Sequence, residues 1–527
     1  MRGRVILFLL ALTMLSCSKN DMYHGRDIDY DYGRDLKHGA IVLGDRLDNP
    51  YKTENMTRAL LSLYPAKADR VELNSTDLYV RFLPEDKAQC DLLEDLGLHL
   101  VDHPLDYDIV VEGDWYHDPM VPDGDVTWQY AVVPVGFEFP DIKYEVIHEC
   151  YLSENDVASK ASVDGIDWEA VERESYVLTG NSAMISEPLT RAGAKVKPSG
   201  RITIVDRHAN GSKPFGVAGV KVMCNSFVKF STAYTDRDGY YTIPKQFSSD
   251  LRYRLVFKNE KGFGIGMNLI LLPASVSTLG KASPQGINMT ITRESEEKLF
   301  NRCAVNNSAY DYYERCSDED MNVAAPPSDL RIWIFHNMVP SCAPMIHHGA
   351  LISAGVLKSF IGKAEFIVAL FAPDITIGLK GRDDYSSIYD SVVHELAHAS
   401  HFSKVGKSYW NTYINYVMES YIKSGKMYGD GTGDDADVCE IGEMWAFHLN
   451  NKLHNERYGG SWPSFGSTYW FYPQIFRYME ERGVKTSEIF NAMGEDIKTK
   501  AQLKERLKQN CPSKSSVIDQ AFNRYTY

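Results

Sequence analysis

Two histidines and a glutamate in the stretch SVVHELAHASHF, residues 391–402, have the types and spacing of a hydrolytic metal centre. On an α-helix, residues four apart leave the same side about one turn apart, so His394 and His398 can both reach one ion. Zinc accepts such imidazole nitrogens at about 2.1 Å. Glu395 lies about 100° further round the helix, where its carboxylate can take a proton from zinc-bound water. The stretch therefore predicts a Zn²⁺ centre in which Glu395 is the catalytic base.

His394, Glu395 and His398 resemble the HExxH motif of the zincin metallopeptidases, and one branch of that family implies a third zinc ligand from a carboxylate on a later helix. The segment DADVCEIGEMWAFHLN, residues 435–450, has an apolar helical face with Glu440 and Glu443 beside it. Glu440 has a local role open to it as the capping-box partner of Asp437, whereas Glu443 has none. We therefore expect Glu443 to be the third ligand. Glu440 is the second candidate and Glu419 a distant third.

The three residues of the first stretch match the HExxH motif of the zincin metallopeptidases position by position, so this part of the chain resembles that family. A metzincin would continue with a glycine and a histidine where this chain has His401 and Lys404, and the resemblance is therefore to the gluzincin-like branch. That branch takes its third ligand from a glutamate on a later helix. His401 lies about 10 Å along the helix axis from His394, too far to share the ion, and is expected to be a surface group or to support the ligands.

A helix and a strand must position these residues. The helix is expected to begin at Ser387, with Asp390 as its capping-box partner, and to bury apolar residues that recur at i+4. In zincins a strand above this helix pairs with the substrate. DITIGL, residues 374–379, is expected to be that strand, or else an internal strand without substrate contact. The resemblance also implies a side chain that steadies the oxyanion, for which Tyr458 and Tyr469 are the expected tyrosines.

The chain has 527 residues, too many for one ordinary core, and its patterns divide it into about three domains. Residues 41–190 alternate strand-like and helical runs and predict an N-terminal α/β domain. Residues 198–290 resemble the carboxypeptidase regulatory-like domain, an immunoglobulin-like or prealbumin-like β-sandwich. The match rests on the strand Gly216–Val222 and the turn Thr235–Tyr241, which is expected to close a hairpin. Residues 291–527 are mostly helical and form the zincin-like domain, so the expected class is multidomain α+β.

The first residues resemble a bacterial lipoprotein signal. Arg2 and Arg4 precede the apolar run VILFLLALTML, which is too short to span a bilayer permanently, and Cys17 follows as the residue that would be lipidated. The alternative for residues 1–17 is an ordinary secretory signal with a coincidental cysteine. Residues 18–40 are expected to be a tether. The resemblance implies a lipid-anchored protein of the cell envelope, at the outer membrane or cell surface of a Gram-negative bacterium.

The formal net charge is -15, from 71 acidic and 56 basic residues. This balance argues against nucleic acid or an anionic lipid surface as partners, because no excess cation is present to release counterions. Nine cysteines are present. Those after Cys17 permit disulfides in an oxidising compartment, for instance between Cys303 and Cys316, but buried thiols account for them equally well.

Together these features predict a lipid-anchored extracytoplasmic zinc metallopeptidase that hydrolyses protein or peptide substrates, with His394, His398 and Glu443 as metal ligands. Only the lipid anchor would contact the membrane. Two alternatives remain open: a catalytically silent surface binding or adhesion lipoprotein with a zincin-like site, and a zinc amidase that acts on cell-wall material. The intact Glu395 counts against the silent protein, because a purely structural site needs no base.

Overall fold

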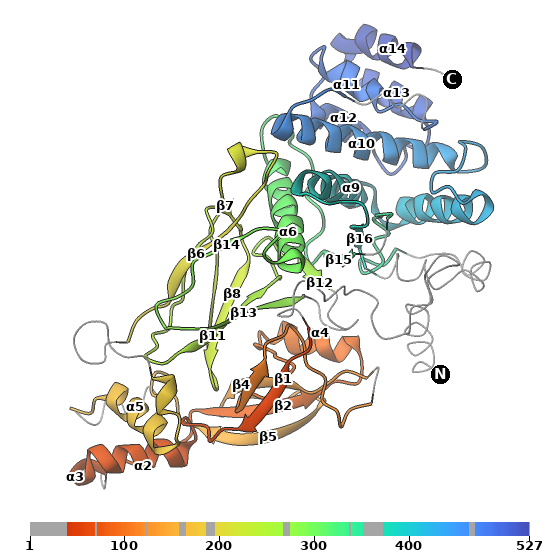
Figure 1. Cartoon of the computed structure of the whole chain (residues 1–527). Coiled ribbons are helices and arrows are strands. Elements are labelled where there is room, and N and C mark those ends of the chain that lie inside the picture. The colour runs from red at the N-terminus through yellow and green to blue at the C-terminus, as the bar shows by residue number, and fades with distance from the viewer. Residues whose placement is uncertain are drawn as a thin grey trace.

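The computed structural model describes residues 39–68, 71–122, 125–156, 165–185, 195–266, 274–336, 339–350, 373–462 and 469–525. Within these ranges the protein combines several separate sheets with helices, which is the expected α+β class in its coarse form (Figure 1). Cys17 and the predicted signal lie outside the described residues, and the boundaries of the predicted domains stay predictions. No helix in the described ranges has the length and hydropathy that a membrane crossing requires.

The N-terminal part holds two antiparallel sheets. In the larger one, β2 (Asp77–Leu83) pairs with β4 (Gln129–Pro134) on one side and with β5 (Lys143–Cys150) on the other. In the smaller one, β1 (Val42–Arg46) pairs with β3 (Tyr107–Val111). The helices of this part are α2 (Thr53–Leu63), α3 (Pro65–Ala68), α4 (Lys87–Asp95) and α5 (Trp168–Leu178). Two apolar clusters lie wholly within this part, and a third extends from it to residues of β8 and β9 and of the turn between them in the middle part.

The middle part consists of two sheets of short strands. One has the order β10-β6-β14, with β7 also paired to β6, and the other has the order β13-β11-β8-β9. The strands are β6 (Ser199–Ile204), β7 (Phe215–Gly216), β8 (Lys221–Ser226), β9 (Lys229–Tyr234), β10 (Tyr240–Thr242), β11 (Leu251–Val256), β13 (Val276–Ala282) and β14 (Met289–Ile291). In Figure 1 they lie between the N-terminal part and the helical C-terminal part.

The turn after β9 differs from the expected hairpin. β9 pairs with β8, whereas β10, which follows the turn, pairs with β6 of the other sheet. The Asp236 carboxylate accepts hydrogen bonds from the backbone N–H groups of Asp238 and Tyr240, both at 2.9 Å, and so closes the turn locally. Gly239 has φ +83° and lies so near β6 that a Cβ would come within 2.0 Å of the Ile202 carbonyl oxygen. The turn therefore carries the chain from one sheet to the other.

The C-terminal part is built beside a parallel sheet of order β12-β15-β16. Strand β12 (Gly264–Gly266) precedes the predicted boundary at residue 291, and β15 (Arg331–Phe335) and β16 (Ile375–Gly378) follow it. The helices are α6 (Glu297–Cys316), α9 (Tyr385–Ser424), α10 (Ala436–Tyr458), α11 (Gln474–Glu480), α12 (Thr486–Ala492), α13 (Lys500–Asn510) and α14 (Ser515–Arg524). Helix α9 packs against both α6 and α10. One hydrophobic core extends from β6 to α14, so the middle and C-terminal parts share a sheet and a core.

A buried ion pair connects the N-terminal part to the other two. Asp114 accepts hydrogen bonds from the backbone N–H of Thr278 in β13, at 2.9 Å, and from Nη1 of Arg302 in α6, at 2.7 Å. Arg302 also donates to the carbonyl oxygen of Val276 at 3.0 Å. Because the two buried charges compensate each other, the pair can stay desolvated while it joins all three parts.

The eight cysteines of the described ranges carry thiols rather than disulfides, and all of them are buried. Cys303 and Cys316 belong to the same helix and lie about 20 Å apart along its axis, so the local pairing that the sequence permits does not form. The thiols fill the core as small apolar groups, which is the other reading that the sequence allows.

Candidate metal centre

Helix α9 carries the HExxH residues and begins at Tyr385, earlier than the expected start at Ser387. Its N-cap is Asp384, whose carboxylate accepts a hydrogen bond from the Ser387 N–H at 2.8 Å, while the Ser387 hydroxyl accepts one from the Asp384 N–H. The expected capping partner Asp390 instead accepts a hydrogen bond from Asn450 of α10 at 2.8 Å. The apolar residues that recur at i+4 are buried, as predicted: Ile388, Val392 and Leu396.

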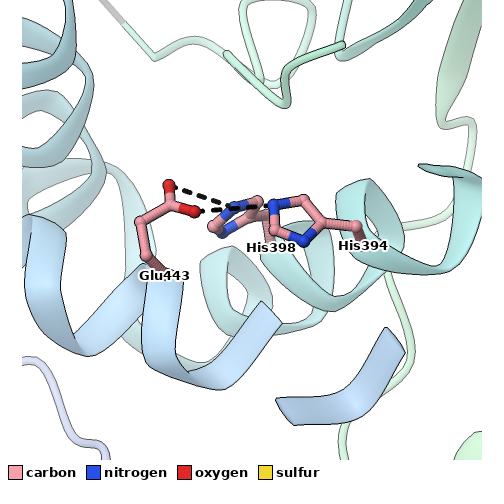
Figure 2. Close-up of side chains that lie close together, drawn as sticks. All are labelled: His394, His398 and Glu443. Carbon is pink, nitrogen blue, oxygen red and sulfur yellow. Dashed lines mark ion pairs between the residues drawn. The ribbon is translucent and has the colours of Figure 1, made fainter. Parts of the chain in front are cut away.

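The three predicted ligands converge between α9 and α10 (Figure 2). Oε2 of Glu443 lies 3.5 Å from Nε2 of His394, and Oε1 of Glu443 lies 3.4 Å from Nε2 of His398. One possible ligand atom from each residue lies within 4.8 Å of the other two. Atoms bound at about 2.1 Å to a tetrahedral zinc ion are separated by about 3.4 Å, so the distance from Oε2 of Glu443 to Nε2 of His394 has the length of an edge of such a site.

The donor set and its surroundings fit a zinc ion. All three side chains are buried, and in the described part of the chain Oε2 of Glu443 has no hydrogen-bond partner. A buried carboxylate oxygen without a partner is costly, and a cation bound between the imidazoles and this carboxylate would compensate it. Burial alone would raise the pKa of Glu443, but His398 and His394 outweigh it and hold the pKa at about 2. Burial lowers the pKa of His398, which favours the neutral imidazole that a metal needs.

Glu395 follows His394 in α9 and is buried as well. Its Oε2 atom has no hydrogen-bond partner among the described residues. Burial raises the pKa of Glu395 to about 8, with His394 and Arg382 opposing the rise and Glu443 adding to it. Burial alone would lower the pKa of His394, but the carboxyls of Glu443 and Glu395 outweigh burial and raise it. A carboxyl that exchanges a proton near neutral pH is suited to general acid–base work.

The other two glutamates considered as ligands have different partners. Glu440 is buried in α10, but its Oε1 atom lies 2.7 Å from Nζ of Lys500 in α13. Its expected partner Asp437 makes no capping box, because α10 begins at Ala436 without a side-chain cap. Glu419 is half exposed and pairs with Lys423 at 3.1 Å. The structure therefore brings Glu443, and neither alternative, to the two histidines.

Tyr413 is a residue of the site that the sequence reasoning missed. Its hydroxyl donates to Oε1 of Glu443 at 2.6 Å and lies 3.5 Å from Nε2 of His398. It belongs to α9, beyond a break at Gly406, where φ is 75° and ψ is 179°. The sequence feature that could have indicated Tyr413 is the single glycine within a long helical pattern, because such a glycine often marks a break in a helix. It does not indicate which side chain after the break lies at the site.

His401 was expected to be a surface group or to support the ligands, and the first of these roles is wrong. It is fully buried, and neither ring nitrogen has a hydrogen-bond partner in the described ranges. Its ring lies 5.3 Å from that of Tyr409 and 5.8 Å from that of Trp410, centroid to centroid. Burial, with a contribution from His398, lowers the pKa of His401 to about 3. The second half of α9 covers His401, and the neutral ring packs there as an apolar group.

The strand DITIGL corresponds to β16, and the internal alternative describes it better. One edge of β16 pairs with β15. On the other edge Thr376 exchanges two backbone hydrogen bonds with Cys342, at 2.9 and 3.1 Å. The Gly378 N–H donates to the Ser341 hydroxyl at 3.1 Å. A substrate backbone would have to displace residues 341 and 342 to pair with this strand.

The two expected tyrosines lie in different places. Tyr458 is engaged elsewhere, because its hydroxyl donates to Oδ2 of Asp206 at 2.8 Å. Tyr469 lies in a group of aromatic rings beside the histidines. Its ring centroid is 5.1 Å from that of Phe447, which in turn is 4.5 Å from that of His394. Only Tyr469 of this pair is near the candidate centre.

Tyr428 belongs to the same aromatic group and was also missed. Its ring lies 5.6 Å from those of Tyr469 and Phe471. Burial raises the pKa of Tyr428 well above its usual value, and the carboxyls of Glu443 and Glu395 add to the rise, so its ring lies in the field of both. A lone aromatic residue in the glycine-rich loop between α9 and α10 gives no periodic signal that could have identified it.

Comparison with known proteins gives no relative that could assign this centre: the chain matches no protein-family model and none of the curated proteins.

Proposed function

We propose that this protein is a zinc metallopeptidase that hydrolyses peptide bonds in protein or peptide substrates. The observation that carries the proposal is the convergence of His394, His398 and Glu443, with the buried carboxyl of Glu395 beside them. Two imidazoles, one carboxylate and an adjacent acid are the set that a catalytic zinc site of the gluzincin-like type requires.

In this site each residue has a separate task. Bound zinc supplies a Lewis acid that polarises the scissile carbonyl and lowers the pKa of water. His394, His398 and Glu443 would hold the ion. Glu395, buried beside the ligands, would accept the proton of the attacking water and pass it to the leaving amine.

The cellular setting is part of the proposal. The resemblance of residues 1–17 to a lipoprotein signal supports a protein anchored by lipid on Cys17 and lying outside the cytoplasm, at the outer membrane or cell surface. The two sheets between Ser199 and Ile291 support a sandwich domain that would act as a spacer between tether and catalytic domain. The zincin-like domain would begin at about residue 291 and contain α9 and α10.

Two other functions use the same centre. A silent binding lipoprotein would keep zinc as a structural ion, but its site would have no use for a buried acid such as Glu395. A zinc amidase acting on cell-wall material would use the same ligands and the same base, and differs only in substrate. We prefer the peptidase because the HExxH resemblance is to peptidases.

The test compares the purified wild-type protein with Glu395→Gln, and with Glu419→Gln as a control at a half-exposed site. Zinc is measured by elemental analysis, and cleavage of a peptide library and of cell-wall fragments by mass spectrometry. We expect about one zinc per chain in all three proteins and peptide cleavage by wild type and Glu419→Gln only. A wild type without bound zinc, or Glu395→Gln cleaving at the wild-type rate, would contradict the proposal. Zinc without turnover would indicate the binding protein, and cleavage of wall fragments alone the amidase.

A further inference from the structure

We propose that Tyr413 is the positioning residue that holds Glu443 as a metal ligand and thereby sets the affinity of the centre for zinc. This inference rests on the proposed metal centre. It concerns a residue of this chain that the HExxH pattern does not include.

The hydroxyl of Tyr413 distinguishes the two oxygens of Glu443. It donates to Oε1 at 2.6 Å, a short bond between a phenol and a buried carboxylate. Nε2 of His398 is 3.5 Å away, so the carboxylate is much the better acceptor for the single hydroxyl proton. Oε2 then remains as the carboxylate oxygen without a hydrogen-bond partner within the described residues, 3.5 Å from Nε2 of His394. The hydroxyl thus leaves Oε2 available to a cation.

Two glycines, Gly406 and Gly442, allow the Tyr413 side chain to lie beside Glu443. Gly406 interrupts α9, and the following turn returns toward the histidines, where the ring of Trp410 lies 5.9 Å from that of His398 and 4.6 Å from that of Tyr413. Gly442, directly before Glu443, leaves room for the tyrosine ring: a Cβ there would lie 3.3 Å from Cε2 of Tyr413.

The close packing around Tyr413 limits the rotamers of Tyr413 and of Glu443. The Tyr413 ring is held between Trp410 and the backbone of α10, and both Tyr413 and Glu443 are buried. A carboxylate whose partner cannot move away keeps its orientation before the metal arrives, so less ordering is needed on binding. Removing the hydroxyl should therefore lower metal affinity rather than abolish the site.

The test measures zinc affinity by competition with a chromophoric chelator for wild type, Tyr413→Phe and Tyr409→Phe. Tyr409 is the matched control, because it is a buried tyrosine of the same helix whose hydroxyl has no hydrogen-bond partner in the part of the chain that the structure describes. We expect Tyr413→Phe to bind zinc about 10- to 100-fold more weakly and Tyr409→Phe to bind it as wild type does. The visible absorption spectrum of the cobalt-substituted protein should change for Tyr413→Phe only, since it reports ligand geometry.

A second variant keeps the test decisive if Tyr413→Phe does not fold. Gly442→Ala retains every polar group and favours the helix, but its methyl group presses on the Tyr413 ring. It should also weaken zinc binding and alter the cobalt spectrum. Wild-type affinity in both Tyr413→Phe and Gly442→Ala, or in the one that folds, would overturn the role of Tyr413 while leaving the peptidase proposal intact. A wild-type protein that binds no zinc would overturn both.

Discussion

Glu440 and Lys500 form an ion pair across the contact between α10 and α13, with 2.7 Å between Oε1 and Nζ. Glu443, in the same helix, faces His394 and His398 instead. Two acids close in sequence therefore have separate roles, one joining helices and one available to a metal.

The first prediction separates these roles. Glu443→Gln should lower zinc affinity by more than about 100-fold, because it removes a charged ligand. Glu440→Gln should retain zinc but lower the free energy of unfolding by roughly 1–3 kcal/mol, because Lys500 loses its buried partner. Metal titration and urea denaturation of both variants measure the two effects. Loss of zinc in Glu440→Gln with retention in Glu443→Gln would exchange the assignments.

The second prediction concerns Gly406. Its φ of 75° with ψ of 179° is a conformation that only glycine adopts easily, and no neighbouring atom would meet an added Cβ. Gly406→Ala should therefore cost about 1–3 kcal/mol through backbone strain alone, and should also weaken zinc binding because Tyr413 depends on this break. Gly425→Ala is the control, since Gly425 has φ 72° at the C-terminal end of α9 and should affect stability only. Equal zinc affinities for the two variants would argue against the link from Gly406 to the site.

The third prediction compares two tyrosines. Tyr428→Phe should lower kcat/KM about 100-fold if its hydroxyl steadies the oxyanion, because the substitution removes a hydrogen-bond donor from the aromatic group beside His394. Tyr458→Phe should leave turnover unchanged and reduce stability by about 1 kcal/mol, since its hydroxyl binds Asp206. Steady-state kinetics on a peptide that the wild type cleaves gives the first value and thermal unfolding the second. Unchanged kinetics in Tyr428→Phe would remove this tyrosine from the reaction.

The fourth prediction is a pH dependence of stability that originates away from the site. Glu172 in α5 is buried and accepts hydrogen bonds from Tyr51 and Lys195, both at 2.7 Å, while Lys229 of β9 lies 3.3 Å away. Burial alone would raise its pKa, but Lys229 and Lys195 outweigh it and lower the pKa from 4.5 to about 2. The folded-state pKa is thus below the unfolded one, so the contribution is complete above about pH 4.5 and is lost as the pH falls toward 2.

That contribution amounts to roughly 3 kcal/mol. The free energy of unfolding, measured with urea between pH 7 and pH 3, should therefore fall more steeply with acidification for the wild type than for Glu172→Gln. Glu419→Gln, at a half-exposed position, should follow the wild-type curve. Parallel curves for wild type and Glu172→Gln would show that this ion pair does not control acid stability.

The sequence predicts the parts of the site that depend on local periodicity. The buried i+4 face of α9 and the side that His394 and His398 share follow from helix geometry alone. The position of Glu443 was predictable because a glutamate on an apolar helical face without a local partner needs one from elsewhere.

Other features of the site and the fold depend on contacts between segments that are distant in the sequence. Tyr413 and the burial of His401 both result from the break at Gly406, and the sequence gives no direction for the chain after such a break. The turn after β9 has the composition of a hairpin, yet Gly239 fits against β6 and carries the chain to the other sheet. In each case tertiary contacts decide between conformations that are locally equivalent.

The pairing of Asp114 with Arg302 has a practical implication for anyone dissecting the molecule. A fragment that starts at β6 would keep Arg302 packed against β13 but lose its counter-ion Asp114, at a penalty of about 3–5 kcal/mol. Such a truncated polypeptide is a poor substitute for the intact chain, and inactivity in it would say nothing about whether the whole molecule turns over substrate.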